Sequence, residues 1–382
     1  MMRPMKLAGS QLLFGAGCLE HLKTLPYRRA MIVIGGSSMQ KNGMLDKVRD
    51  YLAQAGAETE VFEGVEPDPS LDTVLRGVER MNRFEPDLIV ALGGGSPMDA
   101  AKMMWVFYEA PQLKTLQDVL GANPFPALRK KARLCCIPST AGTASEVSRS
   151  VVITDGGQKH GIGNMEMMPD IALCDPQVTV SMPPAITAET GMDGLTHALE
   201  ALVSQRANYV SHILCQQAVL DIFQALPRAY GDGTDLDARE RMLNASMIAG
   251  MAFTNVSLGI VHSMAHAVGS LFHVAHGLAD AVLLPYVIRF NSEKDPQAKE
   301  RYDAMARKLG FADMAAGVAA LGQQVGIPPR LKDLIPDAGA FGGQIHAMAA
   351  MALADGCTKT NPVIPSLQQL EELFAQAYEG WR

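Results

Sequence analysis

Short apolar runs alternate with amphipathic stretches in the first half of the chain, and this pattern restricts the fold more than any other feature. The runs Met31–Ile34 and Leu88–Leu92 end in glycines, and Leu134–Ile137 ends at a proline. Buried strands separated by helical segments are typical of a parallel sheet with crossover helices. We therefore predict an α/β, Rossmann-like domain over residues 1–180.

The second half of the chain has a different pattern. After Pro183 and Pro184 it is rich in Ala, Met and Leu and contains no strand-like run. This predicts an all-α domain over residues 181–382. The stretch 242–279 contains no Asp, Glu, Lys or Arg, but polar residues interrupt it too often for a membrane span. We expect a buried helix pair there and no membrane partner.

Length and charge narrow the classes of function. A chain of 382 residues is long enough for two domains, each with its own core. The net charge of −7, without a basic run, argues against a nucleic-acid partner. The six cysteines form no C-x-x-C pair, which favours a reducing, cytoplasmic location.

A glycine-rich turn follows the run Leu88–Leu92. Its sequence is Gly93-Gly94-Gly95-Ser96-Pro97-Met98-Asp99. Three glycines before a helix can form a phosphate cradle, because the backbone approaches an anion closely and the helix start supplies N–H groups. The alternative is a plain helix start in which Ser96 is the N-cap and Asp99 completes a capping box. Met98 replaces the third glycine, so this is not the dinucleotide fingerprint.

A second polar turn follows the run Leu134–Ile137. It includes the hydroxyl residues Thr140 and Thr143. Turns at neighbouring strand ends would form a pocket at the carboxyl edge of the sheet, where open α/β sheets bind ligands. The alternative is again capping alone, with Thr143 and Glu146 as a capping box.

Acidic and imidazole side chains in the second half have the spacing of metal ligands. Asp193 and His197 are four residues apart, as are His262 and His266, so each pair shares a helix face. One carboxylate with several imidazoles suits Fe²⁺ or Zn²⁺. The alternatives are that Asp193 is a capping partner of Thr190 and that the histidines are ordinary core residues.

Four of the nine histidines lie between residues 262 and 276, inside or next to the uncharged stretch. This clustering favours a metal site, since buried polar groups need partners. Spacing does not decide which of His262, His266, His273 and His276 bind.

Four motifs in the same order closely resemble the iron-containing (group III) alcohol dehydrogenase family. They are Gly93–Lys102, Pro138–Val147, Thr190–Ala198 and Gly250–Val287. The resemblance implies a metal-dependent alcohol dehydrogenase or aldehyde reductase that transfers hydride between NAD(P) and a small primary alcohol, diol or aldehyde. It also implies a nucleotide-binding first domain, a metal-binding second domain, and a homodimer or larger homo-oligomer.

The resemblance also assigns roles that spacing leaves open. It implies that the metal ligands are Asp193, His197, His262 and His276. By the same resemblance, His266 lies near the metal and the substrate without binding the ion. Because it is about one helical turn from a ligand, it is a candidate to pass a proton to solvent; the alternative is that it only supports the site or packs. His273 is expected not to bind.

The expected cofactor-binding residues come from the turns and from the resemblance together. They are Gly94, Gly95, Ser96, Asp99, Thr140, Thr143 and Lys159.

The turn after Met31–Ile34 predicts the choice of cofactor. NAD-preferring relatives resemble this segment but carry an Asp near Gly35 or Gly36, and here no acid occurs between Met31 and Gly43. Donors from the turn, together with Lys41, could receive a 2′-phosphate. The residues concerned are Gly36, Ser37 and Ser38. We predict NADP(H) over NAD(H); the alternative is a turn indifferent to the 2′ position.

Other enzymes share this architecture. A dehydroquinate-synthase-like lyase would need basic residues to grip an anionic substrate, and the stretch 242–279 offers none. A glycerol-dehydrogenase-like enzyme and a non-catalytic metal-binding protein are further alternatives. Phe253 and Leu258 indicate an apolar pocket wall but do not define the length of the substrate.

Overall fold

The chain divides into two compact units, Met1–Met182 and Pro183–Arg382. The computed structural model describes residues 4–380. Each unit is described by itself below.

Unit 1 is built on a six-stranded parallel sheet in the order β1-β8-β5-β4-β2-β3, with a separate antiparallel hairpin, β6-β7. The strands are β1 (Gln11–Phe14), β2 (Arg29–Ile34), β3 (Glu58–Phe62), β4 (Leu88–Gly93), β5 (Arg133–Pro138), β6 (Ser150–Asp155), β7 (Gln158–Gly163) and β8 (Ile171–Cys174). The three predicted apolar runs form β2, β4 and β5, which confirms the parallel sheet.

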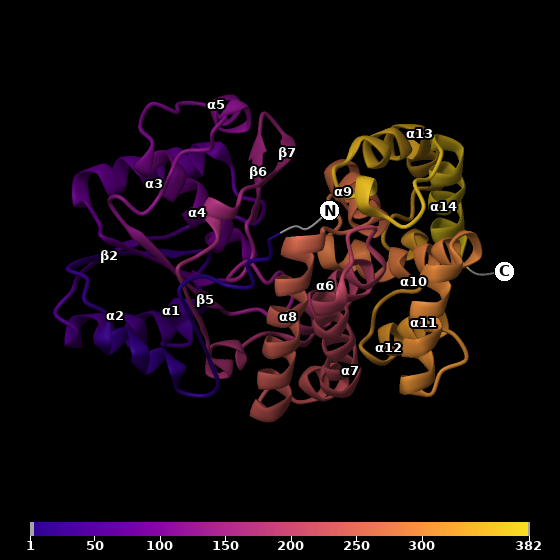
Figure 1. Ribbon diagram of the computed structural model, residues 1–382, viewed down its shortest axis with the longest axis horizontal. Coiled ribbons are helices and arrows are strands. Elements are labelled where there is room, and N and C mark those ends of the chain that lie inside the picture. Colours follow the sequence, from indigo (N-terminus) through magenta and orange to yellow (C-terminus); the bar gives the residue numbers. More distant parts are fainter. Residues whose placement is uncertain (1–3, 381–382) are drawn as a thin grey trace. The chain divides into compact units, whose positions relative to one another are not determined.

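Helices cover both faces of this sheet (Figure 1). The α-helices of unit 1 are α1 (Ser38–Lys41), α2 (Met44–Gln54), α3 (Leu71–Phe84), α4 (Gly95–Glu109) and α5 (Leu116–Gly121), and its 3₁₀ segments are η1 (Cys18–Thr24), η2 (Met165–Met167) and η3 (Pro176–Thr179). One core lies between the sheet and η1 with α2, and the other between the sheet and α3 with α4.

Side chains along the central strands alternate between the two cores. Cys135 belongs to the core under α2, and its neighbour Cys136 belongs to the core under α4. Both thiols are fully buried. Successive side chains of a strand point to opposite faces, so a strand covered on both faces must be apolar throughout.

The connections between strands create a switch point in the sheet. From β2 the chain moves outward to β3, and then crosses to β4 on the other side of β2. Loops that leave the carboxyl ends of β2 and β4 therefore diverge, and doubly wound sheets bind their ligands at such a point.

Unit 2 contains no strand among residues 183–380. Its α-helices are α6 (Pro184–Val203), α7 (Tyr209–Gly231), α8 (Leu236–Val256), α9 (Ile260–Phe272), α10 (His276–Lys294), α11 (Pro296–Leu309), α12 (Met314–Gln324), α13 (Ala338–Ala354) and α14 (Leu367–Glu379), and its 3₁₀ segments are η4 (Leu331–Asp333) and η5 (Thr358–Thr360). Helix α6 packs against α7, α8 and α10.

The uncharged stretch forms most of α8 and all of α9, whose side chains are largely buried, as predicted. Within residues 4–380, no single helix is long and apolar enough to cross a membrane. Together α8 and α9 meet those limits of length and composition, but they are bent by 100° at their junction.

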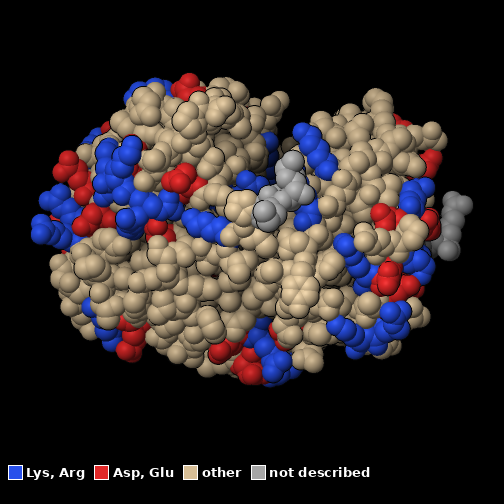
Figure 2. Space-filling view, viewed as in Figure 1, with Lys and Arg blue, Asp and Glu red and all other residues tan. Residues whose placement is uncertain are grey.

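Charged side chains of both signs lie near one another on the face shown in Figure 2. Among the ion pairs of the described residues, Arg228 bonds to Asp235 and Asp237 at 2.8 and 2.9 Å. Exposed pairs of this kind contribute little to stability.

Candidate functional site

The carboxyl ends of three strands lie side by side in unit 1. Ile34 of β2 is in register with Leu92 of β4, which is in register with Ile137 of β5. The loops predicted to bind the cofactor therefore leave the sheet at one edge, at the switch point. These loops contain Gly36–Ser38, Gly93–Ser96 and Ser139–Thr143.

The glycine turn lies against the hydroxyl residues of the neighbouring loop. A Cβ on Gly94 would lie 3.3 Å from Cγ2 of Thr140, and one on Gly95 would lie 3.0 Å from Cγ2 of Thr143. The buried hydroxyl oxygens of both threonines have no hydrogen-bond partner among the described residues. Since buried hydroxyls normally find a partner, this corner fits a bound polar ligand.

The predicted capping box of Ser96 and Asp99 is wrong. Helix α4 begins at Gly95, and its N-cap Gly94 makes no side-chain cap hydrogen bond. The Asp99 carboxylate accepts hydrogen bonds from the hydroxyl of Ser145 at 2.7 Å and from a backbone N–H of β6 at 2.8 Å. These longer-range partners replace the local ones, and the first N–H groups of α4 receive no side-chain cap. That arrangement favours the anion cradle over plain capping.

The predicted capping box of Thr143 and Glu146 is also wrong, because no helix begins at these residues in the described chain. Glu146 is buried, its Oε1 has no hydrogen-bond partner among residues 4–380, and burial raises its pKa to about 7. Nearby, the fully buried Lys102 donates to Ser145 Oγ and to two backbone carbonyls at 2.8 to 3.1 Å. The sequence analysis did not identify either residue as a buried ionisable group.

The loop after β2 has open space, and an acid that was not expected lies beside it. A Cβ on Gly36 would have no described atom within 4 Å, and Ser37 is the N-cap of α1 without a side-chain cap bond there. Lys41 is exposed. However, Gln40 Nε2 donates to Glu63 Oε2 at 2.7 Å, so a carboxylate from the end of β3 lies beside this loop.

Lys159, predicted to line the cofactor site, lies on β7 of the hairpin. Its Nζ lies 2.8 Å from Oδ2 of Asp68. This lysine thus takes part in an ion pair and belongs to a hairpin separate from the six-stranded sheet.

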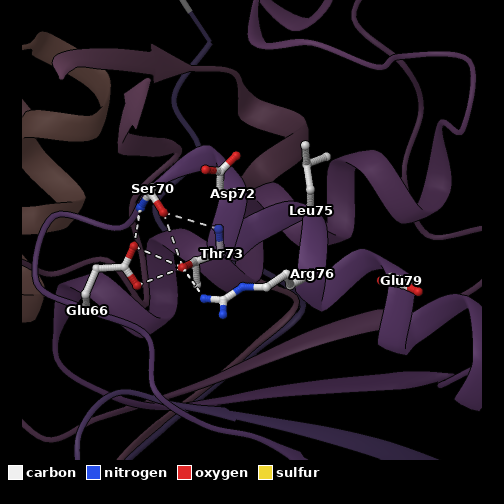
Figure 3. A pocket seen from close by; sticks show the side chains of 7 residues that line it. All are labelled: Glu66, Ser70, Asp72, Thr73, Leu75, Arg76 and Glu79. Atoms are coloured by element: carbon white, nitrogen blue, oxygen red, sulfur yellow. Dashed lines mark hydrogen bonds between the residues drawn. The ribbon is translucent and has the colours of Figure 1, made fainter. Parts of the chain in front are cut away.

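A separate open pocket lies at the start of α3 (Figure 3). The Glu66 carboxylate accepts hydrogen bonds from the Ser70 N–H and the Thr73 hydroxyl, each at 2.8 Å, and Arg76 donates to the same hydroxyl. Because these polar groups already satisfy one another, we assign the pocket no ligand.

Three helices of unit 2 carry the predicted metal ligands. Asp193 and His197 lie in the middle of α6, with His197 Nε2 3.6 Å from Asp193 Oδ1. Helix α6 begins at Pro184, nine positions earlier, so the alternative role of Asp193 as a capping partner is excluded. His262 lies in the first turn of α9, and His276 is the first residue of α10.

Donor atoms from α6, α9 and α10 converge on one point. Ligand atoms of Asp193, His262, His276 and Asp280 all lie within 4.8 Å of one another. His262 Nε2 lies 3.7 Å from Asp193 Oδ1 and 3.9 Å from Asp280 Oδ2, and His276 Nε2 lies 3.1 Å from the same Asp280 oxygen. His197 is beside this group, against Asp193. The sequence analysis missed Asp280.

Four of these donor atoms form no hydrogen bond to the described protein. Asp193 Oδ1, His262 Nε2 and both Asp280 oxygens are buried with no hydrogen-bond partner among the described residues. Burial raises the pKa of Asp193 and lowers that of His262 well below its ordinary value. A cation would satisfy all of these atoms at once, so the residues fit a divalent metal of the Fe²⁺ or Zn²⁺ type.

Glu200 lies about one helical turn beyond His197 on α6, and it fixes the orientation of His262. Its Oε2 lies 2.7 Å from His262 Nδ1, and its Oε1 accepts the Val261 N–H at 2.7 Å. Burial raises the pKa of Glu200 to about 7. This contact leaves His262 Nε2 facing the other donors. Metal-binding histidines are commonly oriented in this way, by a carboxylate that bonds to the ring nitrogen not used for the metal.

His266 lies at the edge of the cluster and is about one third exposed. Its ring stacks on His276 with centroids 5.2 Å apart, and its Nδ1 lies 2.9 Å from Asp355 Oδ2. Burial opposes ionisation of Asp355, but the hydrogen bonds from His266 and Cys357 and the attraction of His266 together outweigh it, so the Asp355 pKa lies below its ordinary value. Asp355 was not identified from the sequence.

Phe253 stacks on His197 at a centroid distance of 4.3 Å, and both Phe253 and Leu258 are largely buried. His273 is exposed and ends α9 in the left-handed conformation, at φ 55°. It is not among the converging donors.

Gly277 allows α10 to begin close to α6. A Cβ at this position would lie 2.4 Å from the Glu189 carbonyl oxygen and 3.3 Å from Cβ of Asp193. Any larger residue would push apart the helices that carry Asp193 and His276.

Two family models match the chain. Residues 9–176 match the iron-containing alcohol dehydrogenase model, and residues 187–378 match the model described as Fe-containing alcohol dehydrogenase family, C-terminal. The NADPH-dependent butanol dehydrogenase of Clostridium saccharobutylicum is 43% identical over 378 residues, with 96% of each chain covered. The chain also matches bifunctional aldehyde-alcohol dehydrogenases, of which it spans 44 to 46%.

Solved structures agree with these matches. An iron-containing alcohol dehydrogenase from Thermococcus thioreducens superposes with a TM-score of 0.93 at 34% identity, covering 99% of this chain and all of the other. A 1,3-propanediol oxidoreductase gives a TM-score of 0.90 at 35% identity, covering 98% of this chain and 100% of that one.

Proposed function

Because the chain belongs to the iron-containing alcohol dehydrogenase family, we propose that it interconverts short-chain aldehydes and primary alcohols or diols, with NADP(H) preferred over NAD(H). The observation that supports this most is the convergence of unpartnered donors from α6, α9 and α10. The two family matches favour a dehydrogenase over the dehydroquinate-synthase-like alternative.

We assign the metal to Asp193, His197, His262 and His276, with Fe²⁺ ahead of Zn²⁺. A bound divalent ion would supply Lewis acidity, which lowers the pKa of an alcohol and polarises a carbonyl. Glu200 holds the His262 ring so that its Nε2 faces the other donors.

The proton and the substrate are handled by residues beside the donors. His266, anchored by Asp355 and partly exposed, passes the alcohol proton to solvent. Phe253 and Leu258 provide an apolar surface that limits water near the reacting carbon. An apolar surface suits short alkyl chains such as those of propanal and butanal.

The cofactor would lie at the strand ends of unit 1, and its reduced nicotinamide supplies the hydride. The α4 N-terminus at Gly94 and Gly95 and the unpartnered hydroxyls of Thr140 and Thr143 would bind its diphosphate. The loop at Gly36 supports NADP(H), since it carries no acid of its own and has open space, although Glu63 lies nearby. The NADPH-dependent relative supports the same preference.

The test is consumption of NADPH by the Fe²⁺-loaded protein with propanal, butanal and a 3-hydroxyaldehyde. We expect one cofactor oxidised for each aldehyde reduced, and a higher kcat/KM with NADPH than with NADH. Transient use of the cofactor without net oxidation would contradict the proposal.

A homodimeric or larger assembly and a cytoplasmic location also belong to this proposal. Light scattering of the purified protein and fractionation of the producing cells would test them.

A further inference from the structure

Asp280 lies in the first turns of α10, four residues after His276 and on the same helix face. Its side chain is completely buried. The carboxylate reaches 3.1 Å from His276 Nε2 and 3.9 Å from His262 Nε2. It therefore faces the same point as the proposed ligands.

The surroundings of Asp280 are unfavourable to an ionised carboxylate unless a cation is bound beside it. Neither oxygen forms a hydrogen bond of acceptable geometry with a described residue, although His276 Nε2 lies 3.1 Å from one of them. The buried Glu200, by contrast, uses one oxygen for Val261 and the other for His262. An ionised carboxylate that is buried without an opposite charge is strongly destabilised, and a bound cation would supply that charge.

We propose that Asp280 is a further protein ligand of the metal, so that the site holds two carboxylates as well as imidazoles. This rests on the metal site proposed above. Donors about 2.0–2.3 Å from one ion lie no more than about 4.6 Å apart, close to the 4.8 Å limit that the Asp193, His262, His276 and Asp280 atoms satisfy. Together with His197, the chain would offer five donors.

A second carboxylate changes which ions the site accepts. Structural and catalytic Zn²⁺ sites use three or four protein ligands, whereas Mn²⁺ and Fe²⁺ accept more oxygen donors at higher coordination number. Two carboxylates also neutralise a divalent ion. The site is therefore selective for Mn²⁺ and Fe²⁺ relative to a variant without this carboxylate.

The experiment compares wild type with Asp280→Asn, which keeps the shape and removes the charge. Each metal-free protein is titrated with Mn²⁺ and with Zn²⁺ alone, in competition with a chelator. We expect Asp280→Asn to lose at least about tenfold in Mn²⁺ affinity and much less in Zn²⁺ affinity. The control is Glu200→Gln, which removes a contact to His262 and should weaken both metals to a similar degree.

Two further measurements do not depend on activity. Asp280→Asn should gain less Tm than wild type when Mn²⁺ is added to the metal-free protein. The wild-type Co²⁺ protein should show the weak visible bands of five- or six-coordination, and the variant the intense bands of a tetrahedral site.

The possible failures are distinguishable. If wild type binds no divalent ion, the proposed function fails and this inference fails with it. If wild type binds metal but the variant shows unchanged Mn²⁺ and Zn²⁺ affinities, or the wild-type Co²⁺ spectrum is tetrahedral, Asp280 is not a ligand. The spectrum of wild type decides the question even if the variant does not fold.

Discussion

Nδ1 of His266 lies 2.9 Å from Oδ2 of Asp355, so the carboxylate fixes how this imidazole is turned beside the metal donors. Asp355 also accepts the Cys357 N–H at 2.7 Å through its other oxygen, and it is therefore itself held in place. A histidine anchored in this way can transfer a proton through its remaining nitrogen without losing its orientation.

Replacing His266 by Ala should leave the metal content unchanged and lower kcat by about 100-fold, the usual contribution of a general acid–base group. Asp355→Asn should have a smaller effect, because the imidazole remains but loses its charged anchor. Metal analysis, kcat and the solvent deuterium isotope effect on kcat are the measurements. If His266→Ala has the same kcat as wild type, His266 does not transfer the proton and serves only in packing.

His262→Ala should remove the metal and abolish turnover, because a closed set of donors loses one member. His273→Ala is the matched control, since it removes an exposed imidazole that lies outside the converging donors. Metal content after dialysis, measured by mass spectrometry, checks both. Loss of metal from the His273 variant alone would contradict the ligand assignment.

Gly36→Asp should shift the ratio of kcat/KM from NADPH towards NADH by at least tenfold, about 1.4 kcal/mol of differential binding. The side chain can be accommodated, since no described atom lies within 4 Å of a Cβ there. The added carboxylate would repel a 2′-phosphate and accept a ribose hydroxyl. Gly342→Asp, which adds the same charge at an equally open position in α13, is the control. An unmoved ratio would mean that this loop does not contact the 2′ position.

Glu146 should make the stability of unit 1 depend on pH. Its pKa rises from 4.5 to about 7 on folding, so the folded state holds the proton more tightly than the unfolded state. The free energy of unfolding should therefore fall as the pH rises from 4.5 to 7, by an amount on the order of 3 kcal/mol. Glu146→Gln should remove this dependence and be more stable than wild type above pH 7. Urea unfolding at several pH values measures this free energy, and Glu58→Gln, at an exposed position, is the control. If the free energy of unfolding changes with pH in the same way in wild type and Glu146→Gln, the prediction is wrong.

The parts of the fold that were predictable are those in which local pattern and burial agree. Strands β2, β4 and β5 are buried on both faces and are therefore apolar throughout, which makes them visible in the sequence. Strand β7, with the sequence Gln-Lys-His-Gly-Ile-Gly, pairs only with β6 and has no such pattern. The capping box of Ser96 and Asp99 failed because Asp99 takes partners in β6 and Ser145, which no local pattern reveals.

The metal donors were partly predictable for a similar reason. Asp193 and His197 share one helix turn, so their spacing brings them together, but the meeting of α6 with α9 and α10 depends on tertiary packing. The resemblance to a family supplied that information for His276. Asp280 had its own signal, since it is the first acid after the uncharged stretch and lies four residues beyond His276. Glu200 and Asp355 had none, because their partners lie 62 and 89 residues away.

Cys135 and Cys136 are neighbours in the chain, yet each is enclosed by a different layer of helices. Burial raises the pKa of both thiols, so neither reacts with an alkylating agent while the sheet stays covered. Because the two thiols are adjacent on β5, their rates of alkylation report separately on the opening of the two helix layers. If the layer containing α2 opens first, Cys135 is labelled before Cys136. If the layer containing α3 and α4 opens first, Cys136 is labelled before Cys135. Simultaneous labelling would mean that unit 1 opens as a single cooperative body.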